Sequence, residues 1–198
     1  MVAVALKKKL ARKLVDRGHL RGADIAHMTL ADVANPAPIT AGFPVDVVRV
    51  DIADRASVDK LIAGRYDVIY LLAAIVSAHA EEDFDAGMNI NLFGSYHVFE
   101  SVRALGTKPV IVFSSSAAVY GGEVPDPIED HTFLNPQTSY GTQKAIGELL
   151  REIILPPAAP GHGALTTPPT LPALPTPVVS SSSFLLRAVE LSHVDQIP

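Results

Sequence analysis

Short apolar segments alternate with longer amphipathic segments along residues 3–155, and this alternation restricts the fold more than any other feature of the chain. The strand segments at 68–72 and 110–113 are apolar throughout rather than at every second residue, which is typical of strands covered on both faces. Such a series predicts an α/β fold with a parallel sheet and flanking helices. Strands are expected at 25–31, 45–50, 68–72 and 110–113, and helices at 3–18, 55–63, 84–105 and 139–154.

The composition excludes several classes of protein. With 198 residues and 48% hydrophobic content, the chain is long enough to bury one core. The net charge is −5 and the basic residues are scattered, so nothing favours nucleic acid as a partner. No apolar run is as long as a membrane span and the N-terminus lacks a signal-peptide pattern, so a cytoplasmic protein without a membrane partner is expected. The chain has no cysteine and its seven histidines lack metal-ligand spacing, so no metal site is expected.

The composition changes abruptly after Leu155. Eight of the 16 prolines lie in residues 156–177, and four serines follow at 180–183. Proline is excluded from helix interiors and from central strands, so this stretch is expected to be an irregular loop. Two regions are therefore predicted: a folded domain at 1–155 and a Pro/Ser-rich irregular tail at 156–198, with a short helix-like segment at 184–192. A proline-rich ligand for a binding groove is the alternative interpretation of the tail.

Tyr140 and Lys144 lie four residues apart on a predicted helix, and a serine-rich strand end precedes them at 114–116. Residues at this spacing share one face of a helix, so the ammonium can lie beside the phenol. A nearby positive charge favours the phenolate and lowers the pKa of the tyrosine. Such a tyrosine can exchange a proton with a substrate hydroxyl or carbonyl. The pair alone also occurs on solvated helix faces, and the serines upstream are what make a catalytic role the favoured interpretation.

These motifs resemble those of the extended short-chain dehydrogenase/reductases, the NAD-dependent epimerase/dehydratase family. The resemblance extends over roughly residues 5–152, and within the family it is greatest to the D-erythronate dehydrogenase branch. It rests on four segments: Leu-Leu-Ala-Ala-Ile-Val-Ser (71–77), the Asn91-Leu-Phe-Gly94 turn, Gly121-Gly122, and Pro-Gln-Thr-Ser-Tyr-Gly-Thr-Gln-Lys-Ala (136–145).

The resemblance implies a catalytic role for three residues and NAD as the cofactor. Tyr140 would be the general acid and base, and Lys144 would lower its pKa and bind the nicotinamide ribose. Ser116 would hold the reacting oxygen, with Ser115 as the alternative, and Ser114 would line the cofactor site. The implied substrate is a small molecule, a sugar acid similar to D-erythronate, and a homodimer is expected.

The resemblance also implies further contacts to NAD. Asp32, at a strand end, would accept hydrogen bonds from the adenosine ribose and so favour NAD over NADP. Asn91 would stabilise the strand end near the catalytic tyrosine, with Asn89 as the alternative register. The other implied cofactor residues are Asp51 and Ile52 at the adenine, for which an N-cap role of Asp51 is equally open, and Leu72, Ala73 and Ala74 beneath the cofactor. The acidic residues Glu81, Glu82, Asp83 and Asp85 suit a helix start and need no catalytic role.

The sequence departs from the family pattern at both ends. Val2, Ala3 and Val4 lead directly into a helix where the family has a strand and a glycine-rich turn that approaches the cofactor pyrophosphate. The expected fold therefore lacks the first strand and the C-terminal substrate domain. The 198-residue chain is expected to bind NAD weakly and to have no measurable activity. A non-catalytic truncated remnant and a nucleotide-sugar epimerase or dehydratase are the two alternatives to a sugar-acid dehydrogenase.

Overall fold

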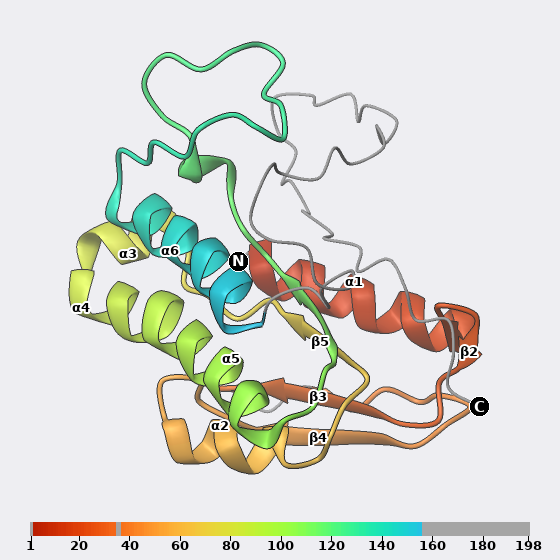
Figure 1. Ribbon diagram of the computed structural model, residues 1–198. Coiled ribbons are helices and arrows are strands. Elements are labelled where there is room, and N and C mark those ends of the chain that lie inside the picture. The colour runs from red at the N-terminus through yellow and green to blue at the C-terminus, as the bar shows by residue number, and fades with distance from the viewer. Residues whose placement is uncertain (1, 35–36, 156–198) are drawn as a thin grey trace, which may run out of the picture.

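The computed structural model describes residues 2–34 and 37–155, and the expected irregular tail lies outside them. Helices alternate with short parallel strands, which confirms the α/β fold (Figure 1). The helices are α1 (Val2–Arg17), α2 (Arg55–Ile62), α3 (Ser77–Glu82), α4 (Phe84–Gly87), the π-helix η1 (Met88–Phe93), α5 (Gly94–Leu105), the 3₁₀-helix η2 (Ala117–Val119) and α6 (Ser139–Ile154). The strands are β1 (His19–Leu20), β2 (Ala23–Asp24), β3 (Met28–Asp32), β4 (Val45–Arg49), β5 (Val68–Leu71) and β6 (Val110–Phe113).

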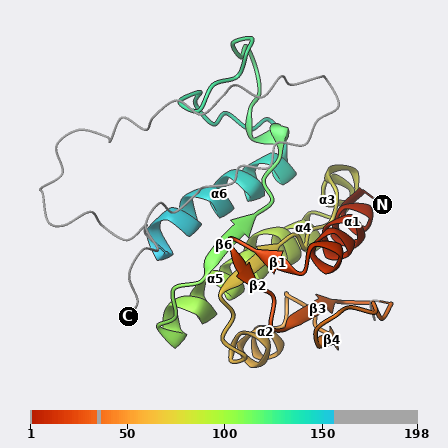
Figure 2. The same cartoon turned by 90° about the vertical axis from the view of Figure 1, so that its right-hand side faces the viewer.

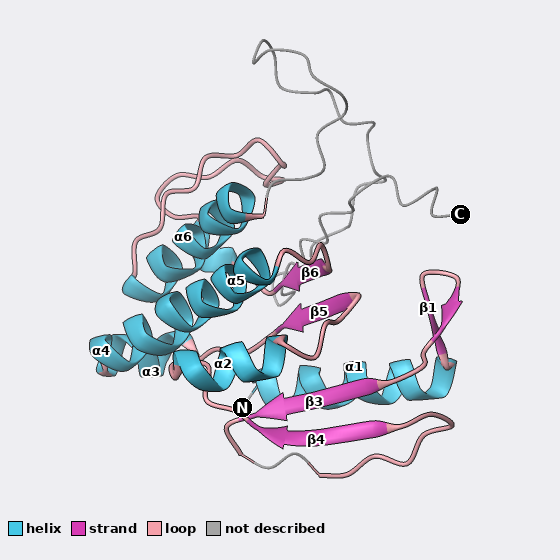
Figure 3. Ribbon diagram, turned by 60° about the horizontal axis from the view of Figure 1, so that its bottom comes forward, coloured by secondary structure: helices cyan, strands magenta, loops and turns pink. Residues whose placement is uncertain are grey.

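The four longer strands form two parallel pairs rather than one continuous sheet. β3 pairs with β4, with Met28 opposite Val45. β5 pairs with β6, with Val68 opposite Val110. All four strands run in the same direction in Figure 3, but among the described residues no hydrogen-bonded ladder joins one pair to the other. The parallel arrangement was predicted, and the division into pairs is what the structure adds.

The first predicted strand is three residues too long at its start. Residues 25–27 belong to no strand, and residues 19–24 just before them form an antiparallel hairpin that was not predicted, in which His19 pairs with Asp24. Its two turn residues, Arg21 and Gly22, have φ angles of 53° and 82°. A glycine adopts this left-handed conformation without steric cost, which explains why the chain reverses here. The strand β3 begins at Met28 and ends at Asp32.

The long helix predicted at 84–105 is one helical stretch made of three segments. Asp83 caps its start by accepting a hydrogen bond from the N–H of Ala86. The turn around Asn91 is widened into a π-helix, a feature that often marks functional sites. Gly94 continues the helix as predicted, and a Cβ on it would lie 2.7 Å from the Ile52 side chain. The short helix α3 just before this stretch was not predicted.

The core lies between β5, β6 and the helices α2 and α5. Its buried cluster contains Val58, Ile62, Leu71, Val98, Phe99, Val102, Ile111 and Phe113. The rings of Phe99 and Phe113 meet edge to face, with centroids 5.7 Å apart. Gly147 lets α6 approach β6, because a Cβ there would lie 2.7 Å from the ring of Phe113. As a result α5 and α6 lie together beside β5 and β6, with α1 apart from them (Figures 1 and 2).

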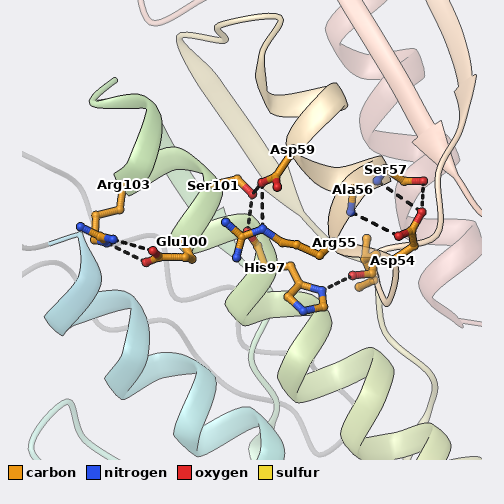
Figure 4. A network of polar contacts seen from close by, with 10 residues as sticks. Asp54, Arg55, Ala56, Ser57, Asp59, His97, Glu100, Ser101 and Arg103 are labelled. Atoms are coloured by element: carbon orange, nitrogen blue, oxygen red, sulfur yellow. Dashed lines mark hydrogen bonds and ion pairs between the residues drawn. The ribbon is translucent and has the colours of Figure 1, made fainter.

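A polar network joins α2 to α5 at the outer side of this core (Figure 4). Asp54 caps α2 by accepting hydrogen bonds from the N–H groups of Ala56 and Ser57. Ser101, on α5, donates a 2.5 Å hydrogen bond to Asp59, which also binds Arg55 at 2.8 Å. The bond from Ser101 is the main reason why the pKa of Asp59 lies below its usual value, and the bond from Arg55 adds to it. The network fixes α5, which carries Asn91 on its N-terminal extension.

Candidate functional site

The candidate site lies where β5 and β6 end side by side. The N–H of Ser114 donates a 3.1 Å hydrogen bond to the carbonyl of Leu71, so the two strand ends are tied together. In open α/β sheets, ligands bind at the carboxyl ends of the strands. The segments that follow β5 and β6 both begin at this hydrogen bond, and α6 packs beside them. The three predicted catalytic residues are therefore brought to one place.

Lys144 is almost completely buried, with 1% of its surface exposed. Its Nζ donates a 2.9 Å hydrogen bond to the carbonyl of Ser114 and lies 4.9 Å from the centroid of the Phe113 ring. Burial lowers the pKa of Lys144 from 10.5 to about 8. A lysine on a solvated helix face would be exposed to water, whereas Lys144 is buried and bonded to the backbone. The structure therefore rules out the solvated-face interpretation for Lys144.

Tyr140 is half-buried near the start of α6, and its ring centroid lies 5.9 Å from Nζ of Lys144. Its pKa was expected to be lowered by that lysine. In the structure burial raises the pKa of Tyr140, and a hydrogen bond with Ser116 lowers it to a smaller extent. The expectation fails in this arrangement because Nζ binds the Ser114 carbonyl beside the Phe113 ring, while the phenol is partly withdrawn from water.

The three serines after β6 occupy different environments. Ser116 contacts Tyr140 and also accepts a 3.2 Å hydrogen bond from the N–H of Ala118, which starts the 3₁₀ turn η2. Ser115, the alternative, has a buried hydroxyl without a hydrogen-bond partner among the described residues. Ser114 turns its hydroxyl back to the carbonyl of Leu71, at 3.3 Å. Ser116 is therefore the serine placed beside the tyrosine, and its catalytic role remains a prediction.

The helix that carries Tyr140 is held at its start by two side chains. Thr138 accepts a 3.0 Å hydrogen bond from the N–H of Gly141. Glu81, from α3, accepts hydrogen bonds from the N–H of Tyr140 at 2.9 Å and from the hydroxyl of Ser139 at 2.8 Å. The bond from the Tyr140 N–H is the main cause of the lowered pKa of Glu81. Sequence reasoning treated Glu81 only as part of an acidic helix start and missed this contact, since nothing local in the sequence links residues 81 and 140.

Asn91 lies on the π-helix and is completely buried, whereas Asn89 is exposed. Its Oδ1 accepts a 2.9 Å hydrogen bond from the N–H of Ile75. Ile75 follows Leu72, Ala73 and Ala74 at the end of β5, and the small size of the two alanines fits close approach of a ligand to the backbone. The segment predicted to pass beneath the cofactor is thus anchored from η1.

Asp32, Asp51 and Ile52 lie at the ends of the other strand pair. Asp32 accepts a 3.2 Å hydrogen bond from the N–H of Ala34 just after β3. Asp51 accepts one from the N–H of Ala53 at 2.9 Å. The N-cap role considered for Asp51 is wrong, because α2 starts at Arg55, four residues later, and is capped by Asp54. The proposed contacts of these residues with the adenosine part of NAD remain predictions.

The part of the chain that the structure describes holds neither a metal-binding cluster nor a membrane-spanning helix. No group of three or more His, Cys, Asp or Glu side chains there is arranged to hold a metal ion. None of the helices in residues 2–34 and 37–155 is long and apolar enough to cross a membrane.

Comparison with known proteins supports the resemblance seen in the motifs. A model of the NAD dependent epimerase/dehydratase family matches residues 9–154. The chain is 46% identical over 146 residues to D-erythronate dehydrogenase from Cupriavidus necator, a match that covers 72% of this chain and 45% of that enzyme. The chain therefore spans about half the length of the relatives that it matches.

Solved structures agree with this result. The chain is similar to a nucleoside-diphosphate-sugar epimerase from Agrobacterium tumefaciens, with 45% identity, a TM-score of 0.71 and coverage of 74% of this chain and 44% of that one. It is also similar to a uronate dehydrogenase from Agrobacterium tumefaciens complexed with NAD. That match has 27% identity, a TM-score of 0.61 and coverage of 75% of this chain and 51% of that one.

Proposed function

Because the chain belongs to the NAD-dependent epimerase/dehydratase family, we propose that its site serves the NAD-dependent oxidation of a sugar acid similar to D-erythronate. The observation that carries the proposal is the assembly of Ser116, Tyr140 and Lys144 at the joined ends of β5 and β6. The sugar acid is favoured because a D-erythronate dehydrogenase is 46% identical over 146 residues.

The described residues fit the nicotinamide half of NAD. The lysine is already held at the strand end, and the alanines after β5 leave the backbone accessible. NAD, when bound, supplies the acceptor of the hydride that leaves the substrate carbon. Lys144 would bind the ribose of that half, and Asp32 would bind the adenosine ribose and exclude a 2′-phosphate.

The proton chemistry belongs to Tyr140. During oxidation the phenolate oxygen takes the proton of the substrate hydroxyl, and during reduction the phenol returns it to the carbonyl oxygen. Ser116 donates to the same substrate oxygen and holds it within reach. Because burial raises the pKa of Tyr140, the phenol is the dominant form at neutral pH. Oxidation should therefore speed up as the pH becomes alkaline.

A hybrid enzyme tests the proposal. Residues 9–154 of this chain would replace the matching segment of the Cupriavidus necator enzyme, and NADH formation would be followed by absorbance with D-erythronate, a uronate and a UDP-sugar. We expect turnover of D-erythronate. Tyr140→Phe should lower the turnover by roughly 10²–10⁴, while Tyr96→Phe, which removes a hydroxyl on the exposed side of α5, should leave it unchanged. An unaffected rate in Tyr140→Phe would exclude the tyrosine as the base.

The second candidate is a nucleotide-sugar epimerase, and the 45% identity to the Agrobacterium protein favours it. An epimerase returns the hydride to the opposite face of the same carbon, so it accumulates no NADH. Chromatography of the UDP-sugar after incubation with the hybrid would separate the two reactions. A new epimer formed without NADH would support the epimerase and contradict the dehydrogenase.

A further inference from the structure

Gln143 is a buried amide next to the candidate lysine on α6. Only 1% of its surface is exposed. Its Oε1 accepts a 2.9 Å hydrogen bond from Nδ2 of Asn91, and Oδ1 of Asn91 in turn accepts the N–H of Ile75. A continuous series of hydrogen bonds therefore runs from α6 through the π-helix η1 to the segment after β5. A buried amide in such a series contributes specificity of geometry, since each unmade bond would be costly.

The donors and acceptors in this series of hydrogen bonds can be arranged in only one direction. The N–H of Ile75 can only donate, so Asn91 must turn its oxygen towards it. The NH₂ group of Asn91 then faces α6, and Gln143 must present an oxygen to it. Reversing either amide would bring two donors together. The acceptor oxygen of Gln143 thus holds Asn91 in the one orientation in which its Oδ1 accepts the N–H of Ile75.

The surroundings of Gln143 are shaped to admit this side chain. A Cβ on Gly87 would lie 2.7 Å from Nε2 of Gln143, so a larger residue on α4 would push the amide away from Asn91. Nε2 is buried and has no hydrogen-bond partner among the described residues, so it favours no other orientation of the Gln143 amide. The bond to Asn91 is therefore what holds the amide in place.

Two neighbouring residues on α6 fix the carboxyl ends of β5 and β6. Lys144 binds the carbonyl of Ser114 after β6. Gln143 reaches Ile75 after β5 by way of Asn91. We propose that Gln143 is a positioning residue that holds Ala73 and Ala74 in place for the nicotinamide half of NAD. The consequence for NAD rests on the proposed function, whereas the effect on the backbone does not.

Two variants of the full 198-residue chain test the proposal. Gln143→Met keeps the length of the side chain and removes the acceptor, while Gln143→Glu keeps an acceptor oxygen. The readout is the amide exchange rate of Ile75 measured by NMR and divided by that of Val102 in the α5 core, so that global destabilisation cancels. We expect this ratio to rise roughly fivefold in Gln143→Met, the worth of about one net hydrogen bond. It should stay near the wild-type value in Gln143→Glu and in the exposed control Gln137→Met.

Titration of the same proteins with millimolar NAD supplies the functional readout. The dissociation constant, followed from the amide shifts of Ala73 and Ala74, should rise about fivefold in Gln143→Met and recover in Gln143→Glu. An unchanged exchange ratio in Gln143→Met, or equal acceleration in both variants, would overturn the positioning role. Unchanged affinity in a variant with faster exchange would overturn the link to the cofactor. A wild-type chain that binds no NAD would count against the proposed function alone, because the exchange ratio still decides the role of Gln143.

Discussion

Replacing Lys144 by methionine should change how the stability of the chain depends on alkaline pH. Burial lowers the pKa of Lys144 from 10.5 to about 8. Between these values the unfolded chain binds more protons than the folded chain, so the wild type gains stability as the pH rises. Below about pH 8 the cost of burying the charge is present in full, and above about pH 10.5 it is absent.

The gap between the two pKa values corresponds to roughly 3 kcal/mol, at 1.36 kcal/mol for each pKa unit. Methionine has a similar length and carries no charge, so its variant lacks this contribution at every pH. It also lacks the hydrogen bond from Nζ to Ser114, which offsets about 1–3 kcal/mol of the gain at neutral pH. The free energy of unfolding of the variant relative to the wild type should therefore fall by roughly 3 kcal/mol between pH 7 and 10.5.

Urea unfolding followed by circular dichroism measures this difference at a series of pH values. All other titrating groups are shared by the two proteins, so their contributions cancel in the comparison. Lys108→Met, at an exposed position, controls for the loss of a surface lysine. A difference that stayed constant across the range would refute burial as the cause of the lowered pKa. The same variant should also bind NAD less well, because it lacks the proposed contact of Lys144 with the nicotinamide ribose. Titration with NAD therefore separates the loss of that contact from the change in stability.

Three other changes have defined outcomes. Gly141→Ala should lower the free energy of unfolding by about 1–3 kcal/mol in urea titrations, because the new Cβ collides with the Ala118 carbonyl; Gly42→Ala, in open space, should change it little. Glu81→Ala should lower the melting temperature near neutral pH and have less effect at acid pH, where the wild-type carboxylate is itself protonated; equal losses at both pH values would contradict the assigned hydrogen bonds. In the hybrid enzyme, Asp32→Ala should bring the KM for NADP closer to that for NAD, and an unchanged KM ratio would show that Asp32 does not select the cofactor.

Local patterns in the sequence were enough to predict the elements around the candidate site. The bounds of β6 and α6 match the prediction, since an apolar run and a capped amphipathic segment define them. The hairpin at 19–24 was missed because its strands are only two residues long and carry no alternation. The π-helix was missed because its extra residue is a response to tertiary packing, and the residues 84–105 read as an ordinary helix.

The site residues likewise divide into those that local sequence patterns indicate and those that only the folded structure brings together. The spacing of Tyr140 and Lys144 and the serines upstream were visible in the sequence. Glu81 and Gln143 were not, because their partners lie 59 and 52 residues away and their identities alone indicate nothing unusual. The raised pKa of Tyr140 could not be predicted either, since burial is a property of the folded molecule. Long-range hydrogen bonds are thus what sequence reasoning lacked.

Local unfolding should divide the molecule unevenly. Among the described residues, the buried cluster draws its members from α2, β5, α5 and β6, and none from β3 or β4. Segments with few buried apolar contacts open at a lower free energy than the core. The pair β3–β4 should therefore open and close as a unit while β5 and β6 stay protected. The end of the site that holds Asp32 would then be the transient end, and a ligand spanning both pairs would slow hydrogen exchange in β3 and β4 far more than in β6.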